Sequence, residues 1–203
     1  MFSRTLLVIL LGTLVPPVKA SDLTSMLSLS RDITNKPPSW RFDVDPCQWQ
    51  AVVCNATGSV TGIDWASLGL GGFANLTILP AGLSFLDLNS NQLTGTPDLA
   101  HLPAGLSSLD LYNNQLTGTP DLAHLPAGLS SLDLNSNQLT GTPDLAHLPA
   151  GLSYLYLNNN QLTGNGTFSS PHVWCSQQLG MCGVGTPGVF NCTSGVWRCG
   201  AAW

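Results

Sequence analysis

Residues 129–151 read LSSLDLNSNQLTGTPDLAHLPAG, and nearly the same 23 letters stand at 83–105 and at 106–128. Successive units open with a leucine or valine at Val60, Leu83, Leu106, Leu129 and Leu152. A tandem repeat of about 20 to 50 residues is typical of a stacked array, in which each unit packs against its neighbours. The period therefore predicts an elongated solenoid.

Each unit contains the spacing L-x-x-L-x-L-x-x-N-x-L, which is the leucine-rich repeat signature. Leu86 and Leu88 flank Asp87, a period-2 pattern that predicts a short strand with its leucines inside. Residues 96–103 place Thr, Pro and Asp in the order of a helix start. The expected class is α/β: a solenoid with a parallel sheet on its concave face, a short helical, 3-10 or irregular convex side, and a cysteine-containing cap at each end.

One asparagine per unit falls at an inward position of the motif. A buried amide needs hydrogen-bond partners, so we expect these side chains to bond backbone groups of the turns. They are Asn91, Asn114, Asn137 and Asn160. Their predicted role is structural.

The N-terminus has the pattern of a secretory signal. Arg4 precedes an apolar run over 6–15, and Val18-Lys19-Ala20 is the small-residue pattern that a signal peptidase cuts. We therefore expect a signal peptide at 1–20 and a protein that is secreted, extracellular or at the cell surface. The apolar run is shorter than the roughly 20 residues that span a bilayer, and no membrane span is expected after signal removal.

Composition narrows the class of partner. Without residues 1–20, four basic residues remain against eleven Asp and no Glu, a net charge of −7. Nucleic acid is therefore excluded as an expected partner. Asn-x-Ser/Thr sequons fit an exported glycoprotein, and they lie at Asn55, Asn75, Asn165 and Asn191.

The predicted domains are a signal peptide at 1–20, an N-terminal cap at 21–59, five repeats at 60–164 and a Cys-rich C-terminal cap at 165–203. Apolar spacing within 21–40 predicts a short capping helix. In an exported chain Cys47 and Cys54 should pair. The other cysteines should pair among themselves, although six cysteines allow fifteen pairings, and they are Cys175, Cys182, Cys192 and Cys199. Their spacing does not favour a metal site, and no cofactor is expected.

The segment around the first two cysteines resembles the extracellular plant-type leucine-rich repeat family, including receptor-like proteins and polygalacturonase inhibitors. Shared elements are Trp40, the run from Cys47 to Cys54 with Trp49, and the strand pattern that follows. Ala51 stands where the family usually has Gly, and each unit is one residue shorter than the plant pattern. The near-identical copies also resemble surface-antigen arrays of kinetoplastid protists. The Leu-Pro-Ala-Gly-Leu phrase resembles bacterial effector repeats, but the cysteine cap and export signal oppose that relation. The resemblance implies a binding solenoid without catalysis of its own.

Two sets of strand-face residues are candidate ligand contacts. Aromatic side chains interrupt a repeated Ser/Asn/Asp surface and suit sugar or protein contacts; they are Phe85, Tyr112, Tyr154 and Tyr156. An aspartate column runs beside them, which a cation or ligand could use, although side chains copied with the fold need no ligand; its members are Asp64, Asp87, Asp110 and Asp133. A second column, His101, His124 and His147, fits solvated histidines copied by duplication better than a metal site.

No catalytic group is expected. A hydrolase needs a nucleophile, base and orienting group within hydrogen-bond reach, and the strand-face Ser84 and Asp87 are separated along the unit from His101. The predicted function is a secreted, non-enzymatic module that binds a protein or carbohydrate ligand through its strand face. The alternatives are a structural surface or matrix spacer, an inhibitor of an extracellular enzyme, and an ice-binding surface of regular Thr and Asn.

Overall fold

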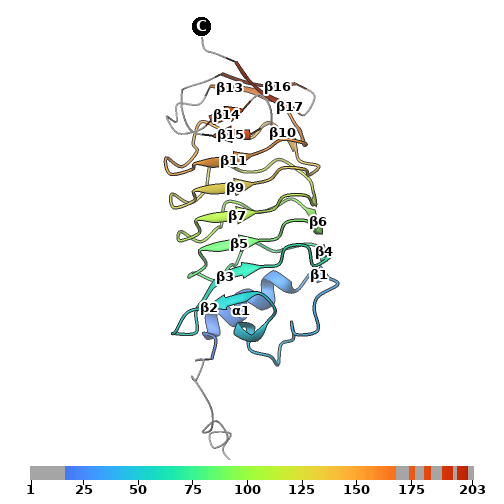
Figure 1. Cartoon of the computed structure of the whole chain (residues 1–203), viewed down its shortest axis with the longest axis vertical. Helices are drawn as coiled ribbons and strands as arrows, with labels where there is room; N and C mark the ends of the chain where they lie inside the picture. Colours follow the sequence, from blue (N-terminus) through green and yellow to red (C-terminus); the bar gives the residue numbers. More distant parts are fainter. Residues whose placement is uncertain (1–16, 168–173, 177–180, 184–188, 194–195, 201–203) are drawn as a thin grey trace, which may run out of the picture.

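A computed structural model describes residues 17–167, 174–176, 181–183, 189–193 and 196–200, with side chains described for residues 17–163. The repeats stack as rungs of one elongated solenoid, and helix α1 lies at its N-terminal end (Figure 1). The solenoid predicted from the 23-residue period is confirmed. Its elements are α1 (Ala20–Ser30), β1 (Ile33–Thr34), a 3-10 turn η1 (Pro46–Gln48), β2 (Val52–Cys54), β3 (Val60–Asp64), β4 (Gly71–Gly72), β5 (Phe85–Asp87), β6 (Gln92–Gly95), β7 (Ser108–Asp110), β8 (Gln115–Leu116), β9 (Ser131–Asp133), β10 (Thr140–Gly141), β11 (Tyr154–Tyr156), β12 (Gln161–Leu162), β13 (Gly164–Thr167), β14 (Trp174–Ser176), β15 (Met181–Gly183), β16 (Val189–Thr193) and β17 (Val196–Gly200).

The main sheet has the strand order β14-β15-β11-β9-β7-β5-β3-β2. Strands β3, β5, β7, β9 and β11 are parallel, and the register places residues 23 apart side by side, as in Leu86 beside Leu109. The leucine at the centre of each repeat strand is buried, while the residues on either side of it are half-buried or exposed. The period-2 pattern therefore decides which face of each rung enters the core.

A second ladder runs along the solenoid and was not expected from the sequence. Strands β4, β6 and β8 pair in parallel, as do β10 and β12. The sequence signal is the short alternation Gln92-Leu93-Thr94, in which only the leucine is buried. Each rung is thus tied to its neighbours by backbone hydrogen bonds on two sides.

The inward asparagines bond the backbone of their own rung and of a neighbouring rung, as predicted. The Oδ1 of Asn91 accepts the N–H of Leu70 at 2.9 Å, and its Nδ2 donates to the carbonyl of Trp65 at 2.8 Å. The bonds between neighbouring rungs recur at Asn114, Asn137 and Asn160. This ladder satisfies backbone groups that the turns would otherwise leave buried without partners.

The other half of each unit is irregular, and the helical start expected at Thr96 is wrong. Asp98 rather than Thr96 caps the turn, because its Oδ1 accepts the N–H of Ala100 at 3.0 Å. Too few residues remain before Pro103 to complete a helix, since proline cannot donate the next hydrogen bond. Leu99 and Leu102 still turn inward and are buried.

The N-terminal cap closes one end of the leucine core. Met26 and Leu29 of α1 are fully buried, and the Oδ2 of Asp22 accepts the N–H of Val60 at 2.9 Å. The expected capping helix is confirmed but ends at Ser30, and Ile33 lies in β1 instead, paired with β4. Indole rings stack behind the cap, with Trp40 between Trp49 and Trp65.

At the other end the main sheet reverses direction. β15 pairs with β11 antiparallel, and β14 pairs with β15 antiparallel. Residue 175, where a sixth unit would open, lies in β14. The array of parallel rungs therefore ends at β11.

Candidate functional site

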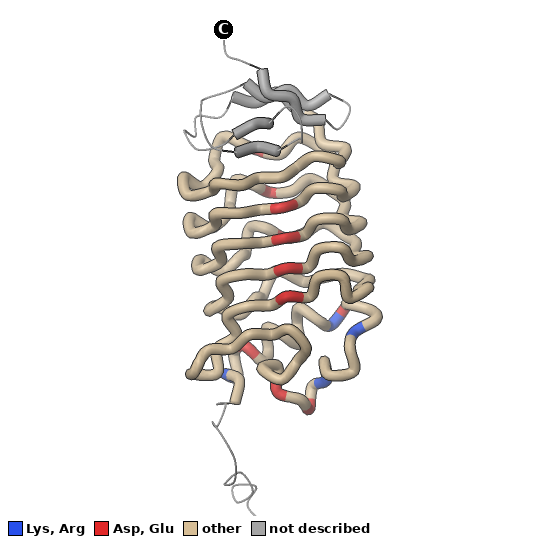
Figure 2. Tube along the Cα trace, viewed as in Figure 1, with Lys and Arg blue, Asp and Glu red and all other residues tan. Residues whose placement is uncertain are grey.

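The strand face is the outward side of β3, β5, β7, β9 and β11. Its side chains form columns because equivalent residues of adjacent parallel strands lie side by side, about 4.8 Å apart. The central column, which we call the acidic column, comprises Asp64, Asp87, Asp110 and Asp133. Figure 2 shows it as a line of acidic residues along the solenoid.

Each aspartate of the column has a local structural role. Its Oδ1 accepts the backbone N–H two residues later, at 2.9 Å from Asn89 to Asp87 and at 2.8 Å from Asn135 to Asp133. These bonds hold the chain where it leaves the strand. The column is therefore part of the repeat architecture, and the second carboxylate oxygen has the greater remaining capacity to accept a hydrogen bond from a ligand.

The second oxygen is used differently along the column. Asn89 donates its Nδ2 to the Oδ2 of Asp87 at 3.1 Å and reaches that of Asp110 at 3.5 Å. The Oδ2 of Asp133 has no hydrogen bond from any residue within 17–163. Within residues 17–163, Asp133 thus has an acceptor without a hydrogen bond at the C-terminal end of the column, as Asp64 has at the other end.

Burial raises the pKa of Asp87, Asp110 and Asp133 in the acidic column. The shift is largest at Asp133, where desolvation, opposed by the Asn135 N–H and reinforced by Asp110 and Asp87, raises the pKa to about 6. Burial is also the leading cause of the raised pKa of Asp87 and of Asp110. A nearby cation would stabilise the charged form of all three.

Two tyrosines adjoin that end of the column. Tyr154 and Tyr156 stack with ring centroids 6.3 Å apart and planes inclined by 7°. Tyr156 pairs in register with Asp133, and Tyr154 with Ser131. Tyr154 is 54% exposed and Tyr156 is half-buried, with its pKa raised by burial and then by Asp133. We call Asp133, Tyr154 and Tyr156 the tyrosine–aspartate corner.

The remaining aromatic candidates lie apart from this corner. Phe85 is half-buried, and its ring occupies the space that a side chain at Gly62 would need. Gly62 therefore accommodates the ring, so Phe85 is less open than the alternation suggests. Tyr112 is 37% exposed and extends from the column of Asn89 and Asn135. The predicted aromatic contacts are thus spread over three rungs, and among them only Tyr154 and Tyr156 stack.

Among the side chains described, those of residues 17–163, no Lys or Arg lies on the rungs of the acidic column. Between Arg41 and Arg198 the sequence has no Lys or Arg. In the described part of the chain the basic residues gather around the N-terminal cap (Figure 2). The strand face therefore presents uncompensated negative charge, which favours a cationic partner.

The histidines lie in the connecting turns, and each has a carboxylate partner that sequence analysis overlooked. The Nδ1 of His124 lies 2.8 Å from the Oδ2 of Asp121, and the pairs His101–Asp98 and His147–Asp144 repeat this contact. The sequence feature that could have predicted these pairs is the i, i+3 spacing of Asp and His. Hydrogen bonding to His124 is the leading cause of the lowered pKa of Asp121. These pairs are exposed, so each adds little to stability.

Cysteine and sequon positions complete the predicted sites. Cys47 and Cys54 form a disulfide beside α1. The side chains at the other predicted positions lie outside the described ones; they are Cys175, Cys182, Cys192, Cys199, Asn165 and Asn191. Within residues 17–163, Asn55 is exposed and Asn75 is half-buried.

Among the described residues, no three His, Cys, Asp or Glu side chains are grouped to hold a metal ion. No helix in the same part of the chain is long and apolar enough to cross a membrane.

The chain is similar to known leucine-rich repeat sequences and structures. The family profile described as "Leucine rich repeat N-terminal domain" matches residues 19–55, and "Leucine Rich Repeat" matches 105–125. The BIR2 ectodomain from Arabidopsis thaliana is 30% identical, with a TM-score of 0.58 over 73% of this chain and 83% of that chain. The LRR ectodomain of the receptor kinase SOBIR1 from Arabidopsis thaliana is 25% identical, with a TM-score of 0.59 over 73% and 84%. No curated protein matches the sequence.

A third similar structure contains bound partners. The Arabidopsis receptor kinase HAESA, in complex with the peptide hormone IDA and the co-receptor SERK1, is 27% identical with a TM-score of 0.57. The alignment covers 71% of this chain but 26% of that one. The likeness is thus to a segment of a longer solenoid.

Proposed function

Since the chain belongs to the plant-type extracellular leucine-rich repeat family, we propose that it is an extracellular, non-enzymatic module that binds a peptide or protein on its strand face. The observation that carries this proposal is the tyrosine–aspartate corner at the end of an uncompensated acidic column. The peptide hormone in the HAESA complex supports a ligand of the same chemical kind.

The corner favours a ligand segment with a Lys or Arg side chain. The free Oδ2 of Asp133 can accept a hydrogen bond from a cationic group, and the exposed ring of Tyr154 offers an aromatic surface beside it. Burial around Asp133 makes a charged contact there stronger than at an open surface. Binding of a cation would in turn lower the pKa of Asp133.

Position along the column explains why the contact falls at this end. At Asp87 the donor Asn89 already bonds the second oxygen, so a ligand would share that oxygen with Asn89. At the C-terminal end Tyr156 takes the place of the next aspartate. Among the side chains of residues 17–163, a cationic group therefore meets an unbonded Oδ2 beside two stacked tyrosines at Asp133.

A test is selection from a random peptide library displayed on phage, with the secreted chain immobilised. We expect enriched peptides to contain Lys or Arg and to bind the Tyr154→Ala/Tyr156→Ala variant at least tenfold more weakly. Asp133→Asn should cost about tenfold in affinity, as expected for loss of one partly buried charge contact. His124→Ala, in a connecting turn, is the matched control and should bind as the parent does.

The pH dependence of peptide affinity gives an independent test. Affinity should rise as the pH passes upward through about 6, because Asp133 is then ionised. Peptides that bind the double tyrosine variant equally well would overturn the assignment of the corner. Specific capture on a glycan array, with no peptide selected, would replace the peptide by a carbohydrate ligand.

A structural spacer is the second candidate, because the copies at 83–105 and 106–128 differ at few positions. A spacer would select no ligand from either the peptide library or the glycan array.

A further inference from the structure

We propose that Asn55 carries an N-linked glycan in the folded protein, and that Asn75, the other sequon with a described side chain, does not. This goes beyond the proposed binding function and rests only on the extracellular location included in it. The two asparagines share the same local turn and differ in their surroundings.

The sequon turns are alike at the oxygen of the amide. The Oδ1 of Asn55 accepts the N–H of Thr57 at 2.9 Å and its hydroxyl at 2.8 Å. The Oδ1 of Asn75 accepts the N–H of Thr77 at 3.1 Å and its hydroxyl at 2.6 Å. In both turns the sequon threonine engages the amide oxygen and leaves the nitrogen as the distinguishing atom.

The two nitrogens lie in different environments. Asn75 is half-buried, and its Nδ2 donates to the Oγ of Ser28 in α1 at 3.3 Å. Its neighbours Ala74 and Leu76 are buried in the core. Asn55 is exposed in the turn between β2 and β3, and its Nδ2 has no hydrogen-bond partner among residues 17–163. The nitrogen to which a sugar would attach is therefore bonded to the protein at Asn75 and, among residues 17–163, has no partner at Asn55.

The chemistry of attachment makes this difference matter. The amide nitrogen of a sequon attacks the anomeric carbon of a lipid-linked diphospho-oligosaccharide. A carbon–nitrogen bond forms, the bond from that carbon to the phosphate oxygen breaks, and the lipid diphosphate leaves while the nitrogen loses one proton. The product is a bulky secondary amide.

A chain modified at Asn75 would have to fold with that sugar against α1. The sugar would lie beside Ser28 and disturb the packing of α1 on the first repeats. At Asn55 the sugar extends into solvent and the three hydrogen bonds to its Oδ1 remain. The fold therefore accommodates the modification at Asn55 alone of these two.

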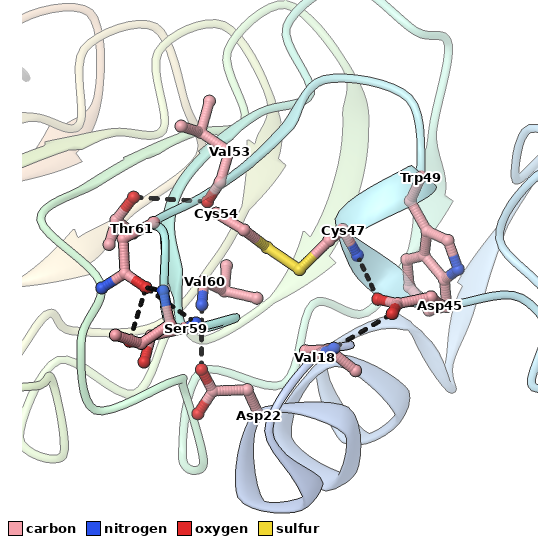
Figure 3. The surroundings of a disulfide bond; sticks show 12 residues. Val18, Asp22, Asp45, Cys47, Trp49, Val53, Cys54, Ser59, Val60 and Thr61 are labelled. Atoms are coloured by element: carbon pink, nitrogen blue, oxygen red, sulfur yellow. Dashed lines mark hydrogen bonds between the residues drawn. A yellow bond between two sulfur atoms is a disulfide. The ribbon is translucent and has the colours of Figure 1, made fainter. Parts of the chain in front are cut away.

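The glycan would leave the proposed binding surface open. Asn55 follows Cys54, whose disulfide to Cys47 fixes this part of the cap (Figure 3). Strand β2 is at one edge of the parallel rungs, and four strands lie between it and β11. At strand spacing, that separates Asn55 from the tyrosine–aspartate corner by about 24 Å.

The experiment uses the full chain secreted from a eukaryotic cell line and cleaved before its aspartates. Residues 45–63 and 64–86 then form separate peptides, each with one sequon. Release of N-glycans by peptide-N-glycosidase in heavy-oxygen water labels every formerly modified asparagine as aspartate. We expect label at Asn55 and none at Asn75.

Variants supply the controls. Asn55→Gln should remove one glycan without lowering secretion, and Asn75→Gln should leave the glycan mass unchanged. Label at Asn75 equal to that at Asn55, or a secreted chain without label at Asn55, would overturn the assignment while leaving the binding experiment intact. Retention of the whole chain inside the cell would overturn the extracellular location as well.

Discussion

Tyr156 lies beside Asp133 across the parallel strands β11 and β9, in the position that aspartate occupies on the four preceding strands. The exchange ends the acidic column and places an aromatic ring against its most perturbed carboxyl group. A small departure from the repeat thus creates the local chemistry of the corner.

Asp133→Asn should make the fold less sensitive to pH. The folded carboxyl has a pKa of about 6 against the usual 3.8, so its protonated form contributes stability that is present below pH 3.8 and lost as the pH rises through 6. We therefore expect the variant to melt a few degrees higher than the parent at pH 7 and with less difference at pH 4, measured by circular dichroism.

Asp144→Asn is the control of opposite sign. The N–H of Ala146 and then His147 lower the pKa of Asp144, so its stabilising effect is present above pH 3.8 and lost below it. This variant should melt slightly lower at pH 7. A parallel rise in both variants would contradict burial as the cause of the Asp133 shift.

Asn114→Ala should destabilise the chain by about 2–4 kcal/mol, because it leaves buried backbone groups without partners. Asn114 accepts the N–H of Leu93 and donates to the carbonyls of Leu88 and Leu111. Denaturant titration followed by tryptophan fluorescence gives the change. His124→Ala, at an exposed pair, should change stability by less than about 0.5 kcal/mol. An equal loss of stability in the two variants would refute the stabilising role of the asparagine hydrogen bonds.

Ala51→Gly should stabilise the protein by about 0.5–1 kcal/mol. Ala51 has φ of 58°, a left-handed conformation that costs an L-residue about 1–2 kcal/mol and glycine almost nothing. The extra freedom of glycine in the unfolded chain offsets part of the gain. Ala104→Gly, at an exposed position without positive φ, should instead destabilise, and chemical denaturation distinguishes the signs.

The backbone register at the C-terminal end predicts a disulfide between Cys175 and Cys182. These residues are directly opposite in the antiparallel pair β14 and β15, where Cα atoms lie about 4.5–5.5 Å apart, within disulfide reach. Cys192 lies opposite Trp197 and Cys199 opposite Phe190, so the register of β16 and β17 does not pair these two cysteines directly. Mass spectrometry of non-reduced peptides should find the Cys175–Cys182 bridge, and a Cys175–Cys192 peptide would refute it.

The sequence predicted the repeat geometry closely because each rung packs against near-copies of itself. Leu86 and Asn91 face inward at positions set by the local period, and the next rung repeats the choice. The family's usual glycine at position 51 likewise marked a backbone need that the positive φ of Ala51 explains. The second ladder was missed because β8, β10 and β12 are each two residues long.

The candidate site was only partly predictable. Alternation placed Phe85 and Asp133 outward together, but it could not reveal that Gly62 leaves room for the Phe85 ring, or that Asn89 occupies the oxygen of Asp87. These contacts join residues of different columns or different rungs. They depend on the distance between side chains of neighbouring columns and rungs, and the hydrophobic pattern of the sequence does not contain that distance.

By itself the sequence determined the solenoid, its inward leucines and asparagines, the capping helix and the Cys47–Cys54 pair, because local period and export chemistry suffice for these. Only the tertiary structure decided that Tyr154 stacks on Tyr156 beside Asp133, whose Oδ2 has no hydrogen bond from residues 17–163. It also decided that Asn55 is exposed, whereas Asn75 donates a hydrogen bond to Ser28 of α1. The physical reason is that burial and side-chain contact depend on neighbours brought together by stacking, whereas the repeat pattern records only the direction in which each residue faces.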